Sequence, residues 1–254
     1  MTVICKTIQE WQDFLSLNVN TTIGFVPTMG NIHQGHIELF QRSVRENKLT
    51  VVSLFVNPSQ FNNQEDYDNY PKTFQQDLEK INNANVNVLF MPSVETMYPN
   101  PDNLKYSIIE DNISLELEGK YRPGHFPGVL TIILKLFNII KPNKAYFGEK
   151  DYQQFKIIEN FAKAFFLDID IICCPTVRNK AGLALSSRNT RLSPQALEHA
   201  KHFPELLMSN MDCKTVIDKL QNLGFIVDYI EDFKGRRFGA VFLEGVRLID
   251  NIQL

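Results

Sequence analysis

Residues Thr22 to His36 read TIGFVPTMGNIHQGH, and this stretch decides the fold of the chain. It opens with an apolar run that predicts a β-strand from Thr22 to Val26, ended by Pro27, and it closes at the start of a helix near Gly35. A strand, a glycine-containing loop and a helix in this order are typical of a parallel sheet with helical crossovers. Because a helix N-terminus carries unpaired N–H groups and a partial positive charge, this loop suits a phosphate group.

Strands and helices alternate along the chain as far as Pro175. Thr7 and Thr73 are the expected N-caps of two of the helices, and Phe74 is expected to face inward. This alternation predicts an α/β fold with a doubly wound parallel sheet, whose ligands bind beyond the carboxyl ends of the strands. The expected strands cover residues 22–26, 49–56, 88–91, 145–147 and 169–174, and the expected helices cover residues 7–17, 73–83, 126–140 and 151–166, with another beginning near residue 35.

The pattern changes after the last expected strand of the sheet. Helices are predicted over residues 193–202 and 214–223, and short antiparallel strands over residues 227–230, 240–243 and 246–249. We therefore expect two domains, with residues 1–175 forming the sheet domain and residues 176–254 forming a small α+β domain.

Composition and charge exclude several classes of protein. The formal net charge is −3, so the chain has no overall positive field that would hold nucleic acid or an anionic membrane. The most apolar stretch, residues 129–140, is broken by Lys135 and Asn138 and is too short to span a bilayer. The first residues lack the pattern of a secretory signal, and the four cysteines form no C-x-x-C pair. We expect a cytoplasmic protein with reduced thiols.

The loop from Pro27 to His36 is the first candidate for chemistry. Gly30 and Gly35 allow the backbone to approach a ligand closely, and His33 and His36 can donate hydrogen bonds to phosphate oxygens. The alternative is a pair of surface histidines at the start of a helix. A zinc site is disfavoured because no cysteine or acidic side chain lies at ligand spacing.

Amide side chains follow the strand predicted over residues 49–56. Asn57 and Gln60 offer neutral donors and acceptors that suit the hydroxyl and carboxylate groups of a small polar substrate. The same residues also suit an ordinary turn, and the sequence leaves both readings open.

A charged loop follows the strand predicted over residues 145–147. Lys150 carries a mobile ammonium group that suits a phosphate chain, and Gln154 lies about one helical turn further on. Glu149 and Asp151 could help to hold magnesium, which binds mainly through nucleotide phosphates. Asp151 is better suited to capping the helix that follows.

The last candidate lies just past the expected domain boundary. Ser186, Ser187 and Arg188 place two hydroxyl groups beside a guanidinium group, which together form an oxyanion clamp. A solvated loop is the alternative.

Seven segments, in the right order, make the chain resemble the pantothenate synthetase, or pantoate–β-alanine ligase, family. Several ordered motifs are far more specific than any one of them, and they span residues 24–194. The segments are VPTMGNIHQGH, VVSLFVNPSQF, NYPKTFQQDL, MPSVETMYP, EGKYRPGHFPGV, KLFNIIKPNKAYFGEKDYQQ and PTVRNKAGLALSSRNTRLSP. The closing VRLIDNI is also similar, whereas the stretch from His202 onward otherwise matches poorly and is expected to be short for the family.

The resemblance implies a nucleotidyltransferase-type Rossmann-like domain, a small C-terminal lid domain, a homodimer and a requirement for Mg²⁺. It implies that Gln60 and Gln154 bind pantoate, that Gln60 also borders the β-alanine position, and that Asn57 lies at the amine pocket. The catalytic residues implied are His33, His36, Lys150 and Arg188. The ATP-binding residues implied are Met29, Gly30, Asn31, Ile32, His33, Gln34, Gly35, His36, Gly148, Glu149, Lys150, Asp151, Val177, Leu185, Ser186, Ser187 and Arg188.

Three substitutions depart from the family's usual pattern. Leu185 stands where methionine is usual and Ser59 where threonine is common, and both changes are conservative. Asn31 replaces a small apolar residue in the ATP loop, which is expected to alter packing near the adenine.

The expected reaction joins pantoate to β-alanine through an acyl-adenylate, with release of pyrophosphate and AMP. A nucleotidyltransferase that makes a stable nucleotide-activated product is the nearest alternative, because it would share the H-x-G-H loop. An NAD-dependent dehydrogenase is disfavoured by the lack of G-x-G-x-x-G after an early strand. An RNA-binding module would need a basic surface, and an inactive homologue stays open.

Overall fold

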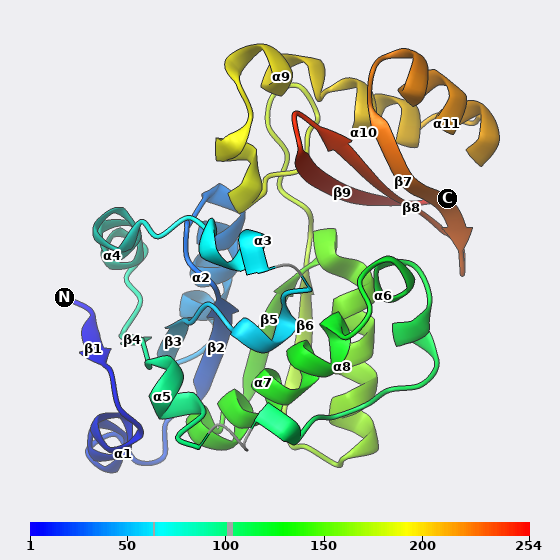
Figure 1. Ribbon diagram of the computed structural model, residues 1–254. Helices are drawn as coiled ribbons and strands as arrows, with labels where there is room; N and C mark the ends of the chain where they lie inside the picture. Colours follow the sequence, from blue (N-terminus) through cyan, green and yellow to red (C-terminus); the bar gives the residue numbers. More distant parts are fainter. Residues whose placement is uncertain (63, 101–103) are drawn as a thin grey trace. The chain divides into compact units, whose positions relative to one another are not determined.

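The computed structural model describes residues 1–62, 64–100 and 104–254, which divide into two compact units (Figure 1). The sheet unit comprises Met1–Ile32, His36–Gly148 and Gln153–Cys174. The C-terminal unit comprises Pro175–Leu254 together with two short segments from earlier in the chain, His33–Gly35 and Glu149–Tyr152.

The sheet unit is built on six parallel strands in the order β1-β4-β3-β2-β5-β6. The chain moves outward from β2 in both directions, which confirms the predicted doubly wound parallel sheet and places the switch point between β2 and β5. The short edge strand β1 is the one strand of this sheet that the sequence did not predict. The strands are β1 (Val3–Cys5), β2 (Ile23–Thr28), β3 (Leu49–Leu54), β4 (Val88–Phe90), β5 (Lys144–Gly148) and β6 (Asp170–Cys174).

Helices cover both faces of this sheet (Figure 1). On one face, Val26 and Val52 pack with Phe40 of α2 and Ile81 of α4. On the other face, Phe25 meets Phe137 of α7 edge-on, with ring centroids 6.4 Å apart. The helices of the unit are α1 (Ile8–Ser16), α2 (Gln34–Glu46), α3 (Gln64–Asp68), α4 (Phe74–Asn83), α5 (Val94–Met97), α6 (Glu118–Tyr121), α7 (His125–Ile140) and α8 (Tyr152–Ala164), with 3₁₀ turns η1 (Pro58–Gln60) and η3 (Ile113–Leu115). The turn η4 (Glu149–Asp151), just before α8, belongs to the C-terminal unit.

Strand β2 continues through Pro27 to Thr28, so the prediction that it ends before the proline is wrong. The carbonyl groups of Thr22 and Thr28 face β3, and that of Ile23 faces β5, so Pro27 turns its missing N–H toward β5. Pairing with β5 stops after Phe25, whereas pairing with β3 continues to Thr28. The proline therefore removes no ladder hydrogen bond.

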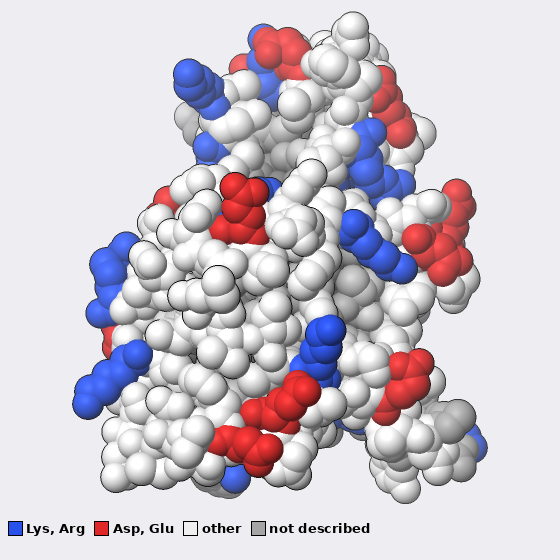
Figure 2. Space-filling view, turned by 90° about the vertical axis from the view of Figure 1, so that its left-hand side faces the viewer, with Lys and Arg blue, Asp and Glu red and all other residues white. Residues whose placement is uncertain are grey.

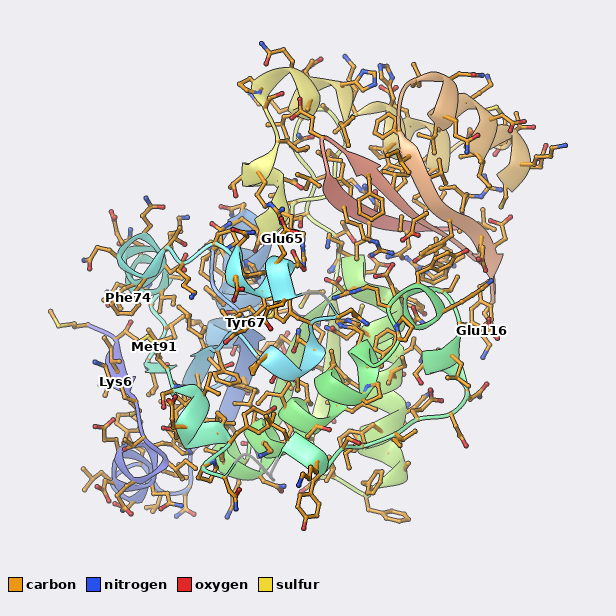
Figure 3. All side chains as sticks on the ribbon, viewed as in Figure 1. Lys6, Glu65, Tyr67, Phe74, Met91 and Glu116 are labelled. Carbon is orange, nitrogen blue, oxygen red and sulfur yellow. The ribbon has the colours of Figure 1, made fainter. Side chains whose placement is uncertain are left out.

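Two helix starts were predicted from threonine caps. Thr7 caps α1 in a capping box with Glu10, which confirms that prediction. Thr73 precedes α4 but makes no side-chain cap, because its hydroxyl instead donates to Asp77 Oδ2 at 3.0 Å. Phe74, labelled in Figure 3, is 38% exposed, so its predicted inward position is wrong.

The C-terminal unit packs three helices with a three-stranded antiparallel sheet in the order β7-β8-β9. The predicted antiparallel strands are confirmed, although each is longer than expected because tight turns at positive-φ residues join them. Phe203, Leu207, Val216 and Val241 lie in its core. The elements are η5 (Ser187–Arg191), α9 (Pro194–His199), α10 (His202–Leu207), α11 (Cys213–Asn222), β7 (Ile226–Phe233), β8 (Arg236–Leu243) and β9 (Val246–Gln253).

The distribution of surface charge and the state of the cysteines can be compared with what the composition predicts. Side chains of both charge signs are interspersed on the face that Figure 2 shows. All four cysteines are in the thiol form. Among the described residues, no helix is long and apolar enough to cross a membrane.

An ion-pair network ties the end of α2 to the sheet. Glu46 accepts hydrogen bonds from Arg42 at 2.9 Å, Lys144 at 3.2 Å and the Tyr146 hydroxyl at 3.0 Å. Arg42 also donates to the Cys173 carbonyl oxygen at 2.9 Å. The hydrogen bond from Arg42 is the main cause that lowers the pKa of Glu46 from 4.5 to about 2.

We predict that this network makes stability depend on pH. Because the folded pKa of Glu46 lies below its unfolded value, its contribution is present above about pH 4.5 and is lost as the pH falls toward 2. The side chains of Arg42 and Glu46 are 34% and 30% exposed, so solvent screening reduces the effect to about 1 kcal/mol. The free energies of urea unfolding of the parent and of Glu46→Gln should differ by this amount near pH 6 and converge as the pH falls to about 2. Glu38→Gln, an exposed change on the same helix, is the control; an equal pH dependence for Glu46→Gln and the parent would contradict the assignment.

Candidate active site

The loop between β2 and α2 is fastened to α4 by a buried carboxylate. Asp77 is 1% exposed, and its two oxygens accept the backbone N–H groups of Asn31 at 2.9 Å and Ile32 at 2.7 Å. Lys80, one turn further along α4, donates from Nζ to the Ile32 carbonyl oxygen at 2.6 Å. The amphipathic pattern of this helix gave no sign of such a role, because an acidic residue normally marks a solvated face.

Two residues of this loop have left-handed backbone conformations. Gly30 has φ +89°, and a Cβ there would lie 3.2 Å from Asp77 Oδ2. Asn31 has φ +49°, a conformation that asparagine tolerates better than most side chains. The backbone conformation thus gives a physical reason for asparagine at position 31, where the resemblance implied a small apolar residue.

The H-x-G-H residues have defined roles in the local structure. The Gly35 N–H donates to His33 Nδ1 at 3.1 Å, so Nδ1 is unprotonated and the neutral ring carries its proton on Nε2. A Cβ on Gly35 would lie 2.8 Å from the His33 ring, which explains the glycine. The ring of His36 stacks on Phe40 within α2, with centroids 6.4 Å apart. Both imidazoles are partly exposed, as a phosphate ligand requires.

The loop after β3 brings its two amides into contact. Asn57 Nδ2 donates to Gln60 Oε1 at 3.1 Å, and Gln60 Nε2 donates to Met29 Sδ at 3.3 Å. The loops after β2 and β3 therefore meet at Met29 and Gln60, as expected for neighbouring parallel strands whose carboxyl ends share one edge.

Turn η1, which carries Gln60, lies directly on α7. A Cβ on Gly128 would come within 2.3 Å of the Ser59 carbonyl oxygen, so only glycine permits this approach. His125 Nδ1 lies 2.9 Å from the Gln60 carbonyl oxygen, a hydrogen bond in which the ring nitrogen is the donor. The sequence motif HFPG thus supplies both the close packing and the hydrogen bond that hold η1 in place.

The two glutamines that open α8 have different roles. Gln153 is 5% exposed, accepts the Glu118 N–H at 3.0 Å, and donates to the carbonyl oxygens of Ile113 and Glu116 at 2.8 and 2.7 Å. The Gln153 amide is therefore occupied by the backbone between Ile113 and Glu118. Gln154 is half-buried and is the member of the pair suited to a ligand.

Within the C-terminal unit, the turn that carries Lys150 is anchored by the last two strands. Asn251 donates from Nδ2 to the carbonyl oxygens of Glu149 and Lys150, both at 2.9 Å. Arg236 donates to Glu149 Oε1 and to Asn251 Oδ1, also both at 2.9 Å. The Lys150 ammonium lies 3.6 Å from Asp151 Oδ1. The sequence analysis missed Arg236 and Asn251, although Asn251 lies in the quoted VRLIDNI segment.

The serine-arginine loop forms 3₁₀ turn η5 in the same unit. Ser186 caps the turn by accepting the Arg188 N–H at 3.2 Å, and Ser187 is 9% exposed. The Leu185 N–H donates to the Val177 carbonyl oxygen at 2.9 Å. Ser186 thus caps η5 in the local structure, in addition to the ligand-binding role predicted for it.

The predicted site residues fall into two groups, one for each unit. The sheet unit holds Met29, Gly30, Asn31, Ile32, His36, Asn57, Gln60, Gly148 and Gln154. The C-terminal unit holds His33, Gln34, Gly35, Glu149, Lys150, Asp151, Val177, Leu185, Ser186, Ser187 and Arg188.

Comparisons with known proteins identify the family. The family model described as pantoate-beta-alanine ligase matches residues 3–253. The chain belongs to the pantoate–β-alanine ligase family. It is 49% identical over 252 residues to pantothenate synthetase of Legionella pneumophila (strain Lens), covering 99% of each chain, and 45% identical to that of Coxiella burnetii (strain Dugway 5J108-111), covering 99% of this chain and 97% of the relative.

Solved structures of pantoate–β-alanine ligases have the same fold. The ligase of Francisella tularensis, solved in complex with beta-gamma ATP and β-alanine, has a TM-score of 0.95 and 42% identity, covering 100% of this chain and 98% of that one. Pantothenate synthetase of Thermus thermophilus has a TM-score of 0.90 and 34% identity, each chain covered to 99%. The matches extend far beyond His202, so the expectation of a short and poorly matched C-terminal region is wrong.

The chain is therefore a ligase that condenses pantoate with β-alanine in an ATP-dependent reaction. The expected fold class and activity are both confirmed, and the alternatives of a dehydrogenase, an RNA-binding module and a nucleotidyltransferase with a stable product are set aside.

We predict that Asp77→Asn weakens the use of ATP by this ligase. The variant turns an NH₂ group toward a backbone N–H and leaves a buried donor unsatisfied, so the KM for ATP should rise roughly 10- to 100-fold. Steady-state kinetics with ATP varied at saturating pantoate and β-alanine would measure this. Glu79→Gln, an exposed change on the same helix, is the control and should leave the KM unchanged. A folded Asp77→Asn protein with the parental KM for ATP would show that the loop does not need this carboxylate.

Proposed function

We propose that the ligase works through a pantoyl-adenylate. The pantoate carboxylate attacks the α-phosphorus of ATP and expels pyrophosphate, and the β-alanine amine then attacks the mixed anhydride and expels AMP. The observation that best supports this route is the loop between β2 and α2, whose backbone is fixed by Asp77 at the start of a helix. Such a helix start suits the phosphates of a nucleotide.

The first step brings two anions together, so positive charge must be in place before they meet. We assign that role to His33, His36, Lys150 and Arg188, with His36 the expected proton donor. Preorganised donors of this kind act mainly by positioning and electrostatic stabilisation, and no covalent enzyme intermediate is needed. The His33 tautomer supports the assignment, because Nε2 carries the proton that a phosphate oxygen would accept.

ATP is assigned to the residues that the family resemblance implies. From the sheet unit these are Met29 to Ile32, His36 and Gly148; from the C-terminal unit they are His33 to Gly35, Glu149 to Asp151, Val177 and Leu185 to Arg188. Loops after parallel strands and helix starts are the usual sources of nucleotide contacts in this type of sheet.

Pantoate is assigned to Gln60 and Gln154. Gln60 Nε2 donates to a thioether sulfur, which is a weak acceptor that a carboxylate or hydroxyl oxygen would readily replace. Gln60 also borders the proposed β-alanine position, and Asn57 belongs to the wall of that pocket.

Magnesium is expected to be held mainly by the ATP phosphates. Magnesium commonly keeps several waters and binds through substrate phosphates rather than in a dedicated protein cage. Asp151 is the nearest fit for a protein oxygen ligand, because Glu149 is engaged by Arg236 and the Asp151 side chain is 44% exposed. Bound Mg²⁺ would neutralise phosphate charge.

Three further proposals concern the setting of the reaction. Residues 176–254 act as a lid that keeps water from the adenylate, which is prone to hydrolysis. The enzyme works as a homodimer, and it acts in the cytoplasm, in agreement with its thiol cysteines.

Exchange of labelled pyrophosphate into ATP tests the proposed intermediate. The exchange should require pantoate and Mg²⁺ and should proceed without β-alanine, because the adenylate forms before the amine reacts. Exchange that depends strictly on β-alanine would contradict a separate adenylation step.

We predict that His36→Ala and Lys150→Ala each slow adenylation roughly 10²- to 10³-fold, the scale for loss of one preorganised donor. Single-turnover measurement of pantoyl-adenylate formation would give the rate. Lys48→Ala, which removes an exposed cation from the sheet unit, is the control and should keep the parental rate. Changes below about threefold in both variants would reject the assigned roles.

A further inference from the structure

Beneath Gln60 lies a buried chain of hydrogen bonds that begins at a tyrosine. Tyr98, which follows α5 in the MYP motif, is 6% exposed, and its hydroxyl donates to Asn57 Oδ1 at 2.8 Å. Asn57 is 1% exposed, and its Nδ2 donates to Gln60 Oε1 at 3.1 Å. Three side chains from two segments of the sheet unit, the end of α5 and the loop that carries η1, are thus joined in series.

The orientation of the middle amide is fixed by backbone groups that cannot change their role. The Ser59 N–H can only donate, and it contacts Asn57 Oδ1 at 3.4 Å. The Gly128 carbonyl oxygen can only accept, and it receives Asn57 Nδ2 at 3.2 Å. Asn57 Oδ1 therefore faces Tyr98, and both hydrogens of Nδ2 are used, one on Gly128 and one on Gln60. An amide with all its donors used has none left for a substrate.

Tyr98 is held so that it remains a donor. Lys135 Nζ lies 4.3 Å from the centre of its ring and donates to the Met97 carbonyl oxygen at 2.8 Å. Burial raises the pKa of Tyr98, so the hydroxyl keeps its proton at physiological pH. The Ser59 hydroxyl adds a second donor to Asn57 Oδ1 at 3.0 Å.

We propose that Tyr98 is a positioning residue: together with the backbone groups of Ser59 and Gly128 it holds Asn57, and Asn57 in turn orients the Gln60 amide so that its NH₂ group faces pantoate. Because Asn57 Nδ2 occupies Gln60 Oε1, the other branch of the Gln60 amide is a donor and binds an acceptor oxygen, the carboxylate or a hydroxyl of pantoate. This chain of hydrogen bonds from Tyr98 through Asn57 to Gln60, called the relay below, disfavours a ligand that offers an N–H to the Gln60 NH₂ group. Two donors would then face each other. This inference rests on the proposed assignment of pantoate to Gln60.

A double-mutant cycle tests the relay, with the KM for pantoate and the KM for ATP measured for each protein. Tyr98→Phe should raise the KM for pantoate about tenfold and change that for ATP less than about twofold, the scale for one lost hydrogen bond. Gln60→Ala should raise the KM for pantoate at least as much. In the double variant the first change should add nothing, because the residue through which Tyr98 acts is gone.

Tyr146→Phe is the matched control. Tyr146 is also fully buried, and its hydroxyl bonds Asn47 and Glu46 at the far end of α2. Its removal should cost stability without changing the KM for pantoate. Should Tyr98→Phe fail to fold, Ser59→Ala takes its place in the cycle, with a smaller rise of about threefold and the same selectivity for pantoate.

Each outcome decides the proposal. Equal effects of Tyr98→Phe on the KM values of both substrates, or effects that add to those of Gln60→Ala, would mean a merely structural tyrosine. A parental KM for pantoate in Tyr98→Phe, while Gln60→Ala raises it, would overturn the relay and leave the pantoate assignment standing. A parental KM in Gln60→Ala would overturn both.

Discussion

The ligase depends first on one interaction, the pairing of the Asp77 carboxylate with two backbone N–H groups in the loop after β2. A loop that serves phosphates must leave its N–H groups unpaired toward the ligand, yet it must also be held in one conformation. Asp77 meets the second need, because it accepts the N–H groups of Asn31 and Ile32 from the α4 side and so holds the loop in one conformation. The positive φ values of Gly30 and Asn31 follow from that anchorage, because the chain must turn sharply to present both groups to one carboxylate.

The turn that carries Gln60 is held by several buried contacts in a similar way. Gly128 allows α7 to touch turn η1, His125 holds the Gln60 carbonyl oxygen, and Asn57 holds the Gln60 amide. Each contact fixes a different part of one residue. The side chain assigned to the substrates is thus supported by buried partners whose own positions are set by backbone groups, which is how a site keeps its geometry to within fractions of an ångström.

Local signals in the sequence predicted the parallel sheet and the antiparallel C-terminal strands, and they pointed to the loops to which the site residues are assigned. These local signals gave wrong predictions where contacts between distant parts of the chain determine the structure. Pro27 indicated a strand end because the sequence pattern cannot tell which side of a strand lacks a partner. Phe74 was placed inward because it is apolar and begins the helix whose other apolar residues face the core. Asp77 and Asn31 lie 46 residues apart, and Asn251 and Lys150 lie 101 apart. No periodicity links such pairs, although the MYP, HFPG and VRLIDNI segments, quoted for family likeness, contain several of the supporting residues.

The anchorage of Glu149 and Lys150 by Asn251 has a consequence for synthesis on the ribosome. The strands of the parallel sheet are complete once Cys174 has been made, and N-terminal parts of a chain generally fold first. The turn that carries Lys150 receives its two hydrogen bonds from the Asn251 amide only after β9 has been made, well after the parallel sheet. A nascent ligase therefore carries a finished parallel sheet while the turn with Lys150 still lacks its anchor, and that turn is fixed only once β9 has paired.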